Sequence, residues 1–282
     1  MTTLLVITDG VRPDAWKAAG CSNHAELVRT GSATMSARCV LPSRTLPNLA
    51  SMLYGVDPSV HGVHDNTGDG LTGLPDLPSL LQVLAAGQRR SAMFYGWAPV
   101  RWLDPTDTLD HDGFEDVLED PETDLLIAGS AGKYIRTEQP DFVLVYFVGV
   151  DHAGHEYGWM SPRYLEQMRH LDSALAELIG SLPPGSNMLC ISDHGGHGYH
   201  HAMGTEVDVV IPFLMWGKGI VSGCGIESAV TTLSVAPTLA RLLGVSAPTT
   251  WEGGVVDEAI DGDPARARIP WVSSEGATRE TP

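Results

Sequence analysis

The sequence predicts an α/β fold, a three-layer sandwich in which a mostly parallel central sheet carries helices on both faces. Three short apolar runs have the pattern of buried strands, and an aspartate follows each of them. The runs are Leu4–Thr8 before Asp9, Phe142–Val150 before Asp151, and Asn187–Ser192 before Asp193. In an open α/β sheet, ligands bind at the carboxyl ends of the strands. We therefore expect the three aspartates to meet at one site.

The helices between these runs are predicted from their apolar periodicity and from the residues at their ends. They are Thr45–Tyr54, Leu77–Ala86, a long helix from Pro162 to about Leu182, and Thr231–Leu243. Gly55, Gly87 and Gly244 stand directly after three of them, where a left-handed residue commonly ends a helix. Ser161 is placed to cap the long helix, whose first position is taken by Pro162.

Two further strands and a less regular region complete the predicted domain. Ser91–Tyr95 and Ile211–Trp216 have strand-like apolar patterns. The segment from Gly68 to Pro121 is rich in Asp, Pro and Gly and is expected to shape a substrate pocket. Residues 1–256 are expected to form a single domain, and residues 257–282 a loosely packed or disordered tail.

The charge balance excludes some classes of partner. Of the 282 residues, 43% are hydrophobic, enough for a sizeable core. There are 17 Lys and Arg against 35 Asp and Glu, a formal net charge of −18. Such a surface repels phosphate backbones and anionic lipid, so we expect neither bulk nucleic acid nor a membrane as a partner. An anionic substrate would need bound cations that invert the local field.

We expect a cytoplasmic protein. No run approaches the roughly 18 apolar residues that cross a bilayer, and the longest is Phe142–Val150. The first residues lack the basic region and the long apolar region of a secretory signal. The four cysteines form no C-x-x-C pair, which indicates neither a disulfide framework nor a structural zinc ribbon.

Histidine is concentrated next to the strand-end aspartates. Seven of the eleven histidines lie in one stretch: His152, His155, His170, His194, His197, His200 and His201. Carboxylate oxygen and imidazole nitrogen are ligands that suit Zn²⁺, and mixed sets also accept Mn²⁺ or Fe. Three aspartates and three histidines would suffice for two ions: Asp9, Asp151, Asp193, His155, His194 and one of the later histidines. Two cations about 3.5–4 Å apart can hold both the attacking and the leaving oxygen of a displacement at phosphorus.

Four motifs follow one another along the chain. They are Val-Ile-Thr-Asp9-Gly-Val-Arg-Pro-Asp, Thr45-Leu-Pro-Asn48, Asp151 with His155, and Ser-Asp193-His194-Gly. This order resembles the alkaline phosphatase superfamily, and most closely its nucleotide pyrophosphatase/phosphodiesterase branch. The resemblance runs from about residue 3 to residue 245 and implies an alkaline-phosphatase-like fold.

The resemblance also implies a role for each matched position. One metal ion would be surrounded by Asp9, Asp193, His194 and the Thr45 oxygen, and the other by Asp151, His155 and a final histidine. His201 is preferred to His200 as that last ligand, because it keeps the family's spacing from His197 although Ala202 and Met203 are inserted after it. His197 is expected to orient a carboxylate or a ligand from behind.

Thr45 is the nucleophile that the resemblance implies. A free hydroxyl is hardly ionised at neutral pH, and coordination to a divalent cation makes its alkoxide accessible. Its place at a helix start also favours a bound phosphoryl group, although capping of the helix would by itself explain a threonine there. Asn48, one turn further on, is expected to aim its amide at a phosphoryl oxygen.

Together these features predict a metal-dependent hydrolase of small-molecule phosphate esters with two divalent ions, zinc in preference to manganese or iron. A phosphodiesterase or nucleotide pyrophosphatase acting through a covalent phospho-Thr45 intermediate is preferred. A phosphomonoesterase or phosphonate hydrolase on the same fold is the alternative, and it would need extra positive groups for a dianion. A metal-binding scaffold without turnover is a second alternative. A sulfatase is disfavoured, because Cys39 is out of register with the nucleophile position, which falls at Thr45.

Overall fold

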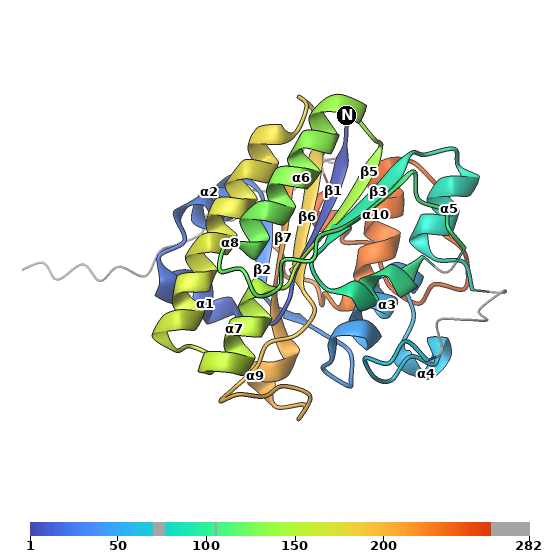
Figure 1. Cartoon of the computed structure of the whole chain (residues 1–282). Helices are drawn as coiled ribbons and strands as arrows, with labels where there is room; N and C mark the ends of the chain where they lie inside the picture. Colours follow the sequence, from blue (N-terminus) through green and yellow to red (C-terminus); the bar gives the residue numbers. More distant parts are fainter. Residues whose placement is uncertain (70–76, 105, 261–282) are drawn as a thin grey trace, which may run out of the picture.

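An eight-stranded sheet forms the middle of three layers in the computed structural model, which describes residues 1–69, 77–104 and 106–260 (Figure 1). The strand order is β4-β3-β5-β1-β6-β7-β2-β8. The strands are β1 (Thr3–Thr8), β2 (Ser32–Arg38), β3 (Ser91–Tyr95), β4 (His111–Phe114), β5 (Phe142–Phe147), β6 (Asn187–Ser192), β7 (Val210–Gly217) and β8 (Cys224–Gly225). From β4 to β6 all neighbours are parallel, whereas β7 is antiparallel to both of its neighbours. The predicted fold class is confirmed.

Helices cover both faces of this sheet (Figure 1). One face carries α1 (Pro13–Ala19), α2 (Ser22–Thr30), α6 (Thr123–Glu138), α7 (Gly149–Tyr157) and α8 (Pro162–Ser181). The other carries α3 (Thr45–Tyr54), α5 (Leu80–Ala86) and α10 (Val235–Leu243). Shorter pieces are α4 (Pro58–His61), α9 (Glu206–Val209) and the 3-10 turns η1 (Ala98–Leu103), η2 (Thr232–Ser234) and η3 (Asp257–Ala259).

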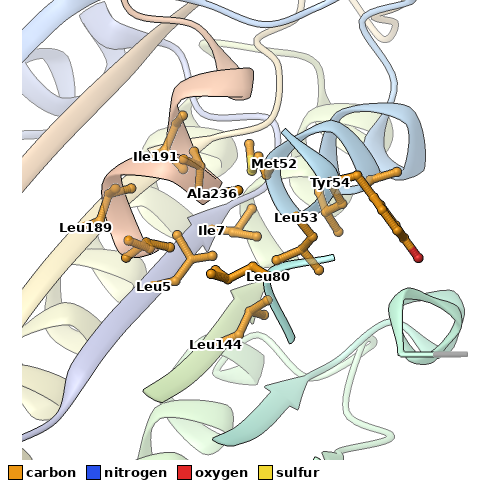
Figure 2. Close-up of a cluster of buried hydrophobic side chains, with 14 of the residues drawn as sticks. Leu5, Ile7, Met52, Leu53, Tyr54, Leu80, Leu144, Leu189, Ile191 and Ala236 are labelled. Atoms are coloured by element: carbon orange, nitrogen blue, oxygen red, sulfur yellow. The ribbon is translucent and has the colours of Figure 1, made fainter. Parts of the chain in front are cut away.

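The central strand β1 serves both layers of helices. Successive side chains of a strand point to opposite faces. Leu5 and Ile7 therefore pack on the side of α3 and α10, where they meet Leu53 and Ala236 (Figure 2). Leu4 and Val6 join the core on the opposite side. Because β1 is buried along its whole length, the residue that follows it is held in a fixed place.

The largest departure from the sequence prediction is at the end of β5. The predicted strand Phe142–Val150 stops at Phe147, and α7 begins at Gly149, so Asp151 lies in the first turn of a helix and not at a strand end. The buried Asp124 side chain accepts the Gly149 N–H at 3.1 Å, which helps to start the helix there. A helix places Asp151 and His155, four residues apart, on the same face.

Other element ends differ by a few residues. The predicted helix Leu77–Ala86 begins at Leu80, after Ser79 has capped it by accepting the Gln82 N–H at 3.3 Å. The predicted helix Thr231–Leu243 is a 3-10 turn, η2, followed by α10. Ser161 caps α8 as expected, with its hydroxyl accepting the Tyr164 N–H at 3.2 Å.

The chain stays packed beyond the predicted domain end at residue 256. Ala259 is buried and its carbonyl accepts the Val221 N–H at 3.0 Å, and Ile260 forms a bridge with Ile220. The expectation of a loose tail is therefore wrong for residues 257–260, and its remainder, 261–282, lies outside the described residues.

Among the helices that the structure describes, none has the length and apolar character needed to traverse a bilayer.

Candidate active site

The predicted site residues converge at the carboxyl edge of the sheet. Strands β1 and β6 are neighbours in register, with Thr8 opposite Ser192, so the residues that follow them, Asp9 and Asp193, lie side by side. Helix α3 begins at Thr45, and α7 contributes the helical pair described above. The chain beyond β6 supplies the later histidines.

Three of these residues form what we call the buried group: Asp9, Asp193 and His194. His194 Nε2 lies 3.3 Å from Asp9 Oδ1 and 3.4 Å from Asp193 Oδ2, and the three side chains are at most 2% exposed. The Thr45 hydroxyl lies 3.4 Å from the same nitrogen. Two carboxylate oxygens and a hydroxyl therefore lie within 3.4 Å of one histidine nitrogen.

Asp151, His155 and His201 form a second set, the open group. One ligand atom from each of the three lies within 4.8 Å of the other two. His155 Nε2 is 3.5 Å from Asp151 Oδ2, and their side chains are 45% and 14% exposed. His200 is exposed and belongs to neither group among the described residues. Asp151 also approaches Asp9 and His194 within the same 4.8 Å, which joins the two groups.

Each histidine of the two groups is held through its Nδ1 atom. The Nδ1 atoms of His155, His194 and His201 lie 3.0, 2.9 and 2.8 Å from the carbonyl oxygens of Tyr199, Gly195 and Ser43, respectively. A carbonyl only accepts, so each Nδ1 carries the hydrogen and donates it. The lone pair of each Nε2 is left for a metal ion, which is the usual arrangement of histidine ligands.

Buried carboxylate oxygens in the site lack hydrogen-bond partners. They are Asp9 Oδ1, Asp151 Oδ1 and Asp193 Oδ2. Burying an unpaired charged oxygen is costly unless a cation or donor satisfies it. This donor set of carboxylate oxygen and imidazole nitrogen fits divalent metal ions.

The electrostatics lead to the same conclusion. Burial raises the pKa of Asp9 well above its usual range, and repulsion from Asp151 and Asp193 raises it further. Burial also raises the pKa of Asp151. Burial lowers the pKa of His201 to about 3, which keeps its imidazole neutral and able to bind a metal. A divalent cation would offset the repulsion among the carboxylates.

A cavity of about 220 Å³ opens onto both groups. Five of its lining residues are Asp9, Thr45, Asp151, His155 and His201. The others are Asn66, Trp97, Leu118, Tyr146, Val148 and His152. The cavity is thus lined both by candidate metal ligands and by several aromatic or aliphatic side chains.

The chain matches the family model described as type I phosphodiesterase / nucleotide pyrophosphatase over residues 3–69 and 88–212. The chain belongs to this family. Its matched residues include every member of the buried and open groups.

Curated relatives and solved structures of other proteins are similar to most of the chain. The human GPI ethanolamine phosphate transferase 2 catalytic subunit is 27% identical over 242 residues, which are 81% of this chain but only 24% of that protein. An inactive variant of murine ectonucleotide pyrophosphatase / phosphodiesterase 5 in complex with AMP has a TM-score of 0.74 at 12% identity, covering 92% of this chain and 100% of that one. An alkaline phosphatase superfamily protein from Vibrio parahaemolyticus has a TM-score of 0.69 at 16% identity, covering 89% and 68%.

The structure does not place Asn48 in the active site of this family member. Its side chain is fully buried, and its amide nitrogen donates to the carbonyls of Val40, Pro42 and Arg44 at 3.3, 3.2 and 3.0 Å. Its Oδ1 accepts from Val40 N–H and from the Thr232 hydroxyl. The expectation that Asn48 donates to a phosphoryl oxygen is therefore wrong, because every polar atom of the side chain already holds the loop before α3.

One further expectation changes in the structure. The N-cap of α3 is Arg44, and Thr45 is the first helical residue, so its hydroxyl does not cap the helix.

His197 orients a carboxylate, which was one of the two alternatives expected for it. Its Nδ1 lies 2.7 Å from Asp208 Oδ1. Asp208 belongs to neither group among the described residues.

Sequence reasoning missed Tyr146 and assigned no definite role to Asn66. Tyr146 lies in a fully buried apolar strand, where a tyrosine normally indicates packing. Asn66 lies in a polar loop after α4, a common setting for turn residues. The spacing of residues in the sequence has no means of showing that both line the same cavity as Thr45.

Proposed function

We propose that this chain is a two-metal phosphodiesterase or nucleotide pyrophosphatase that forms a covalent phospho-Thr45 intermediate on small-molecule phosphate esters. One observation carries the proposal. The Thr45 hydroxyl lies 3.4 Å from His194 Nε2, the nitrogen that two carboxylate oxygens without hydrogen-bond partners also approach within 3.4 Å.

The buried group and the Thr45 oxygen would hold one divalent ion, and the open group would hold the other, with zinc expected in both. When bound, such ions lower the pKa of a coordinated hydroxyl and neutralise charge that develops on phosphoryl oxygens. The hydrogen bonds from the Nδ1 atoms of His155, His194 and His201 to backbone carbonyls leave the Nε2 lone pairs to bind these ions.

The chain's own residues then carry the displacement. Thr45 Oγ1 attacks phosphorus, and a bond from Oγ1 to phosphorus forms. The bond from phosphorus to the leaving alcohol breaks as the oxygen of that alcohol takes up a proton. Water then attacks the phospho-threonine from the opposite side and regenerates the hydroxyl. Two inversions give net retention at phosphorus.

Asn66 replaces Asn48 as the amide expected to contact the phosphoryl group. It lines the cavity, and its Oδ1 accepts the Leu46 N–H at 3.0 Å, which fixes the side chain beside Thr45. Its amide –NH₂ group retains donors for an oxygen that gains charge in the transition state.

The lining of the cavity favours a diester over a monoester. No lysine or arginine lines it among the residues that the structure describes. A monoester dianion would need such a group, whereas a diester carries one negative charge that the metal ions can balance. The AMP bound to the murine relative is consistent with a nucleotide-type substrate.

A phosphoryl-group transferase is the second candidate, because the human transferase is 27% identical to this chain. The transfer reaction differs from hydrolysis only in the second step, where an acceptor alcohol replaces water. Hydrolysis of a diester in the presence of ethanolamine or glycerol distinguishes the two, since a transferase yields a new diester. The cytoplasmic location and the absence of a membrane partner stay predictions.

Thr45→Ala tests the proposed function, with Thr45→Ser as the matched variant that keeps a hydroxyl. We expect Thr45→Ala to lose nearly all hydrolysis of bis(p-nitrophenyl) phosphate while keeping most of its metal by elemental analysis, and Thr45→Ser to retain part of the activity. Equal activity in wild type and Thr45→Ala would contradict the covalent intermediate. A wild type that binds metal but shows no turnover would support the scaffold alternative.

A further inference from the structure

Tyr146 holds one oxygen of Asp9 although the proposed chemistry gives it no role. Its side chain is completely buried, and its hydroxyl donates to Asp9 Oδ2. The other oxygen, Asp9 Oδ1, has no hydrogen-bond partner and lies 3.3 Å from His194 Nε2. Tyr146 therefore leaves Asp9 with a single oxygen directed at the metal position.

Asp193 is restricted in the same way by the backbone. Its Oδ1 accepts the N–H groups of Gly10 and His194 at 3.2 and 2.9 Å. Its Oδ2 has no partner. The buried group thus presents three donor atoms, one from each carboxylate and one from the His194 imidazole.

Three donor atoms suit some ions better than others. Catalytic Zn²⁺ commonly takes three protein ligands and keeps one open position. Mn²⁺ and Mg²⁺ prefer six ligands, mostly oxygen, and accept carboxylates through one or both oxygens. If both oxygens of a carboxylate were available as ligands, the buried group would therefore bind Mn²⁺ or Mg²⁺ more favourably relative to Zn²⁺.

We propose that Tyr146 is a positioning residue that sets the metal preference of the buried group, because it confines Asp9 to one ligating oxygen and thereby favours zinc over manganese. The inference rests on the proposed two-metal function. Tyr146 lies on β5, whereas the ligand Asp9 follows β1. These strands are neighbours in register, so the fold itself aligns donor and acceptor.

The test compares wild type with Tyr146→Phe and with Tyr95→Phe as the matched control. Tyr95 lies opposite Tyr146 in the register of β3 and β5, is equally buried and does not line the cavity. Metal-free proteins are equilibrated with Zn²⁺ and Mn²⁺ in competition, and the bound ions are counted by elemental mass spectrometry. We expect Tyr146→Phe to reduce the preference for zinc by about tenfold and Tyr95→Phe to leave it unchanged.

The outcomes separate this inference from the proposed function. An unchanged preference in folded Tyr146→Phe, or an equal shift in Tyr95→Phe, overturns the role of Tyr146 while diester hydrolysis by the wild type still stands. A wild type that takes up neither ion overturns both. A crystal structure of the zinc-loaded wild type needs no variant: Asp9 bound through Oδ1 alone supports the inference, and binding through both oxygens contradicts it.

Discussion

The buried group and the open group use similar ligands but are held by different parts of the fold. The buried group follows two adjacent central strands, and its side chains are at most 2% exposed. The open group comes from helix α7 and from the loop after β6, where Met203 is 73% exposed. Residues at the end of a buried strand are released only when the core unfolds, whereas helix ends and loops open locally with a smaller free energy.

This contrast teaches that the two sites should differ in how firmly they retain metal. The ligands of the buried group are fixed by Tyr146 and by backbone N–H groups, so little conformational freedom is lost on binding. In the open group, His155 is nearly half exposed and depends on one carbonyl in a loop. We expect a tightly held ion in the first group and an exchangeable ion in the second.

The largest expected effect is in the buried group, with Asp193→Asn. The asparagine carbonyl can keep both backbone N–H bonds, while its –NH₂ group replaces the oxygen that has no partner. We expect hydrolysis to fall by more than about 100-fold, beyond the range usual for groups that only support a ligand. Excess metal should not restore it. Activity that recovers with added zinc would show that the buried group is not the tighter one.

A smaller and reversible effect is expected in the open group, with His201→Ala. Its two remaining ligands stay in place and solvent reaches the site, so activity should fall about tenfold at low free metal and recover as zinc is raised. His200→Ala is the matched control, because His200 is the exposed neighbour and belongs to neither group among the described residues. A greater loss in His200→Ala would reverse the assignment of the last ligand.

A last effect concerns stability, not activity, and arises from His24, which lies outside both metal groups. His24 is buried and stacked on Trp16 with ring centroids 4.0 Å apart, and burial lowers its pKa to about 4. Because the unfolded chain takes up this proton near pH 6.5, the free energy of unfolding should decline as pH falls from 6.5 toward 4, by at most about 3 kcal/mol. The full stability is present above pH 6.5.

Urea unfolding of metal-free protein at pH 7.5 and pH 5 measures this effect. His24→Phe keeps an aromatic ring beside Trp16 but does not titrate, so its loss of stability between the two pH values should be smaller than that of the wild type. Identical losses in both proteins would contradict the assignment to His24.

Some of these features were predictable because they are local in the sequence. The apolar runs of β1 and β6 and the helix Thr45–Tyr54 were predicted at or near their observed bounds, since periodicity and end residues are properties of neighbouring positions. The β5 run was misjudged, because Val148 and Val150 are apolar whether they extend a strand or begin a helix. Contacts with Asp124, far along the chain, decide between the two.

The sequence by itself determined which residue types are present to bind metal and in what order, because ligand chemistry depends on the side chain alone. Only the tertiary structure decided which of their atoms are free. One oxygen of Asp9 accepts a hydrogen bond from a tyrosine 137 residues away, which leaves only the other oxygen without a partner. The Asn48 amide donates to carbonyls of the loop before α3 and is not available in the site. Hydrogen-bond partners are assigned by proximity in space, and that proximity exists only after the strands have been aligned.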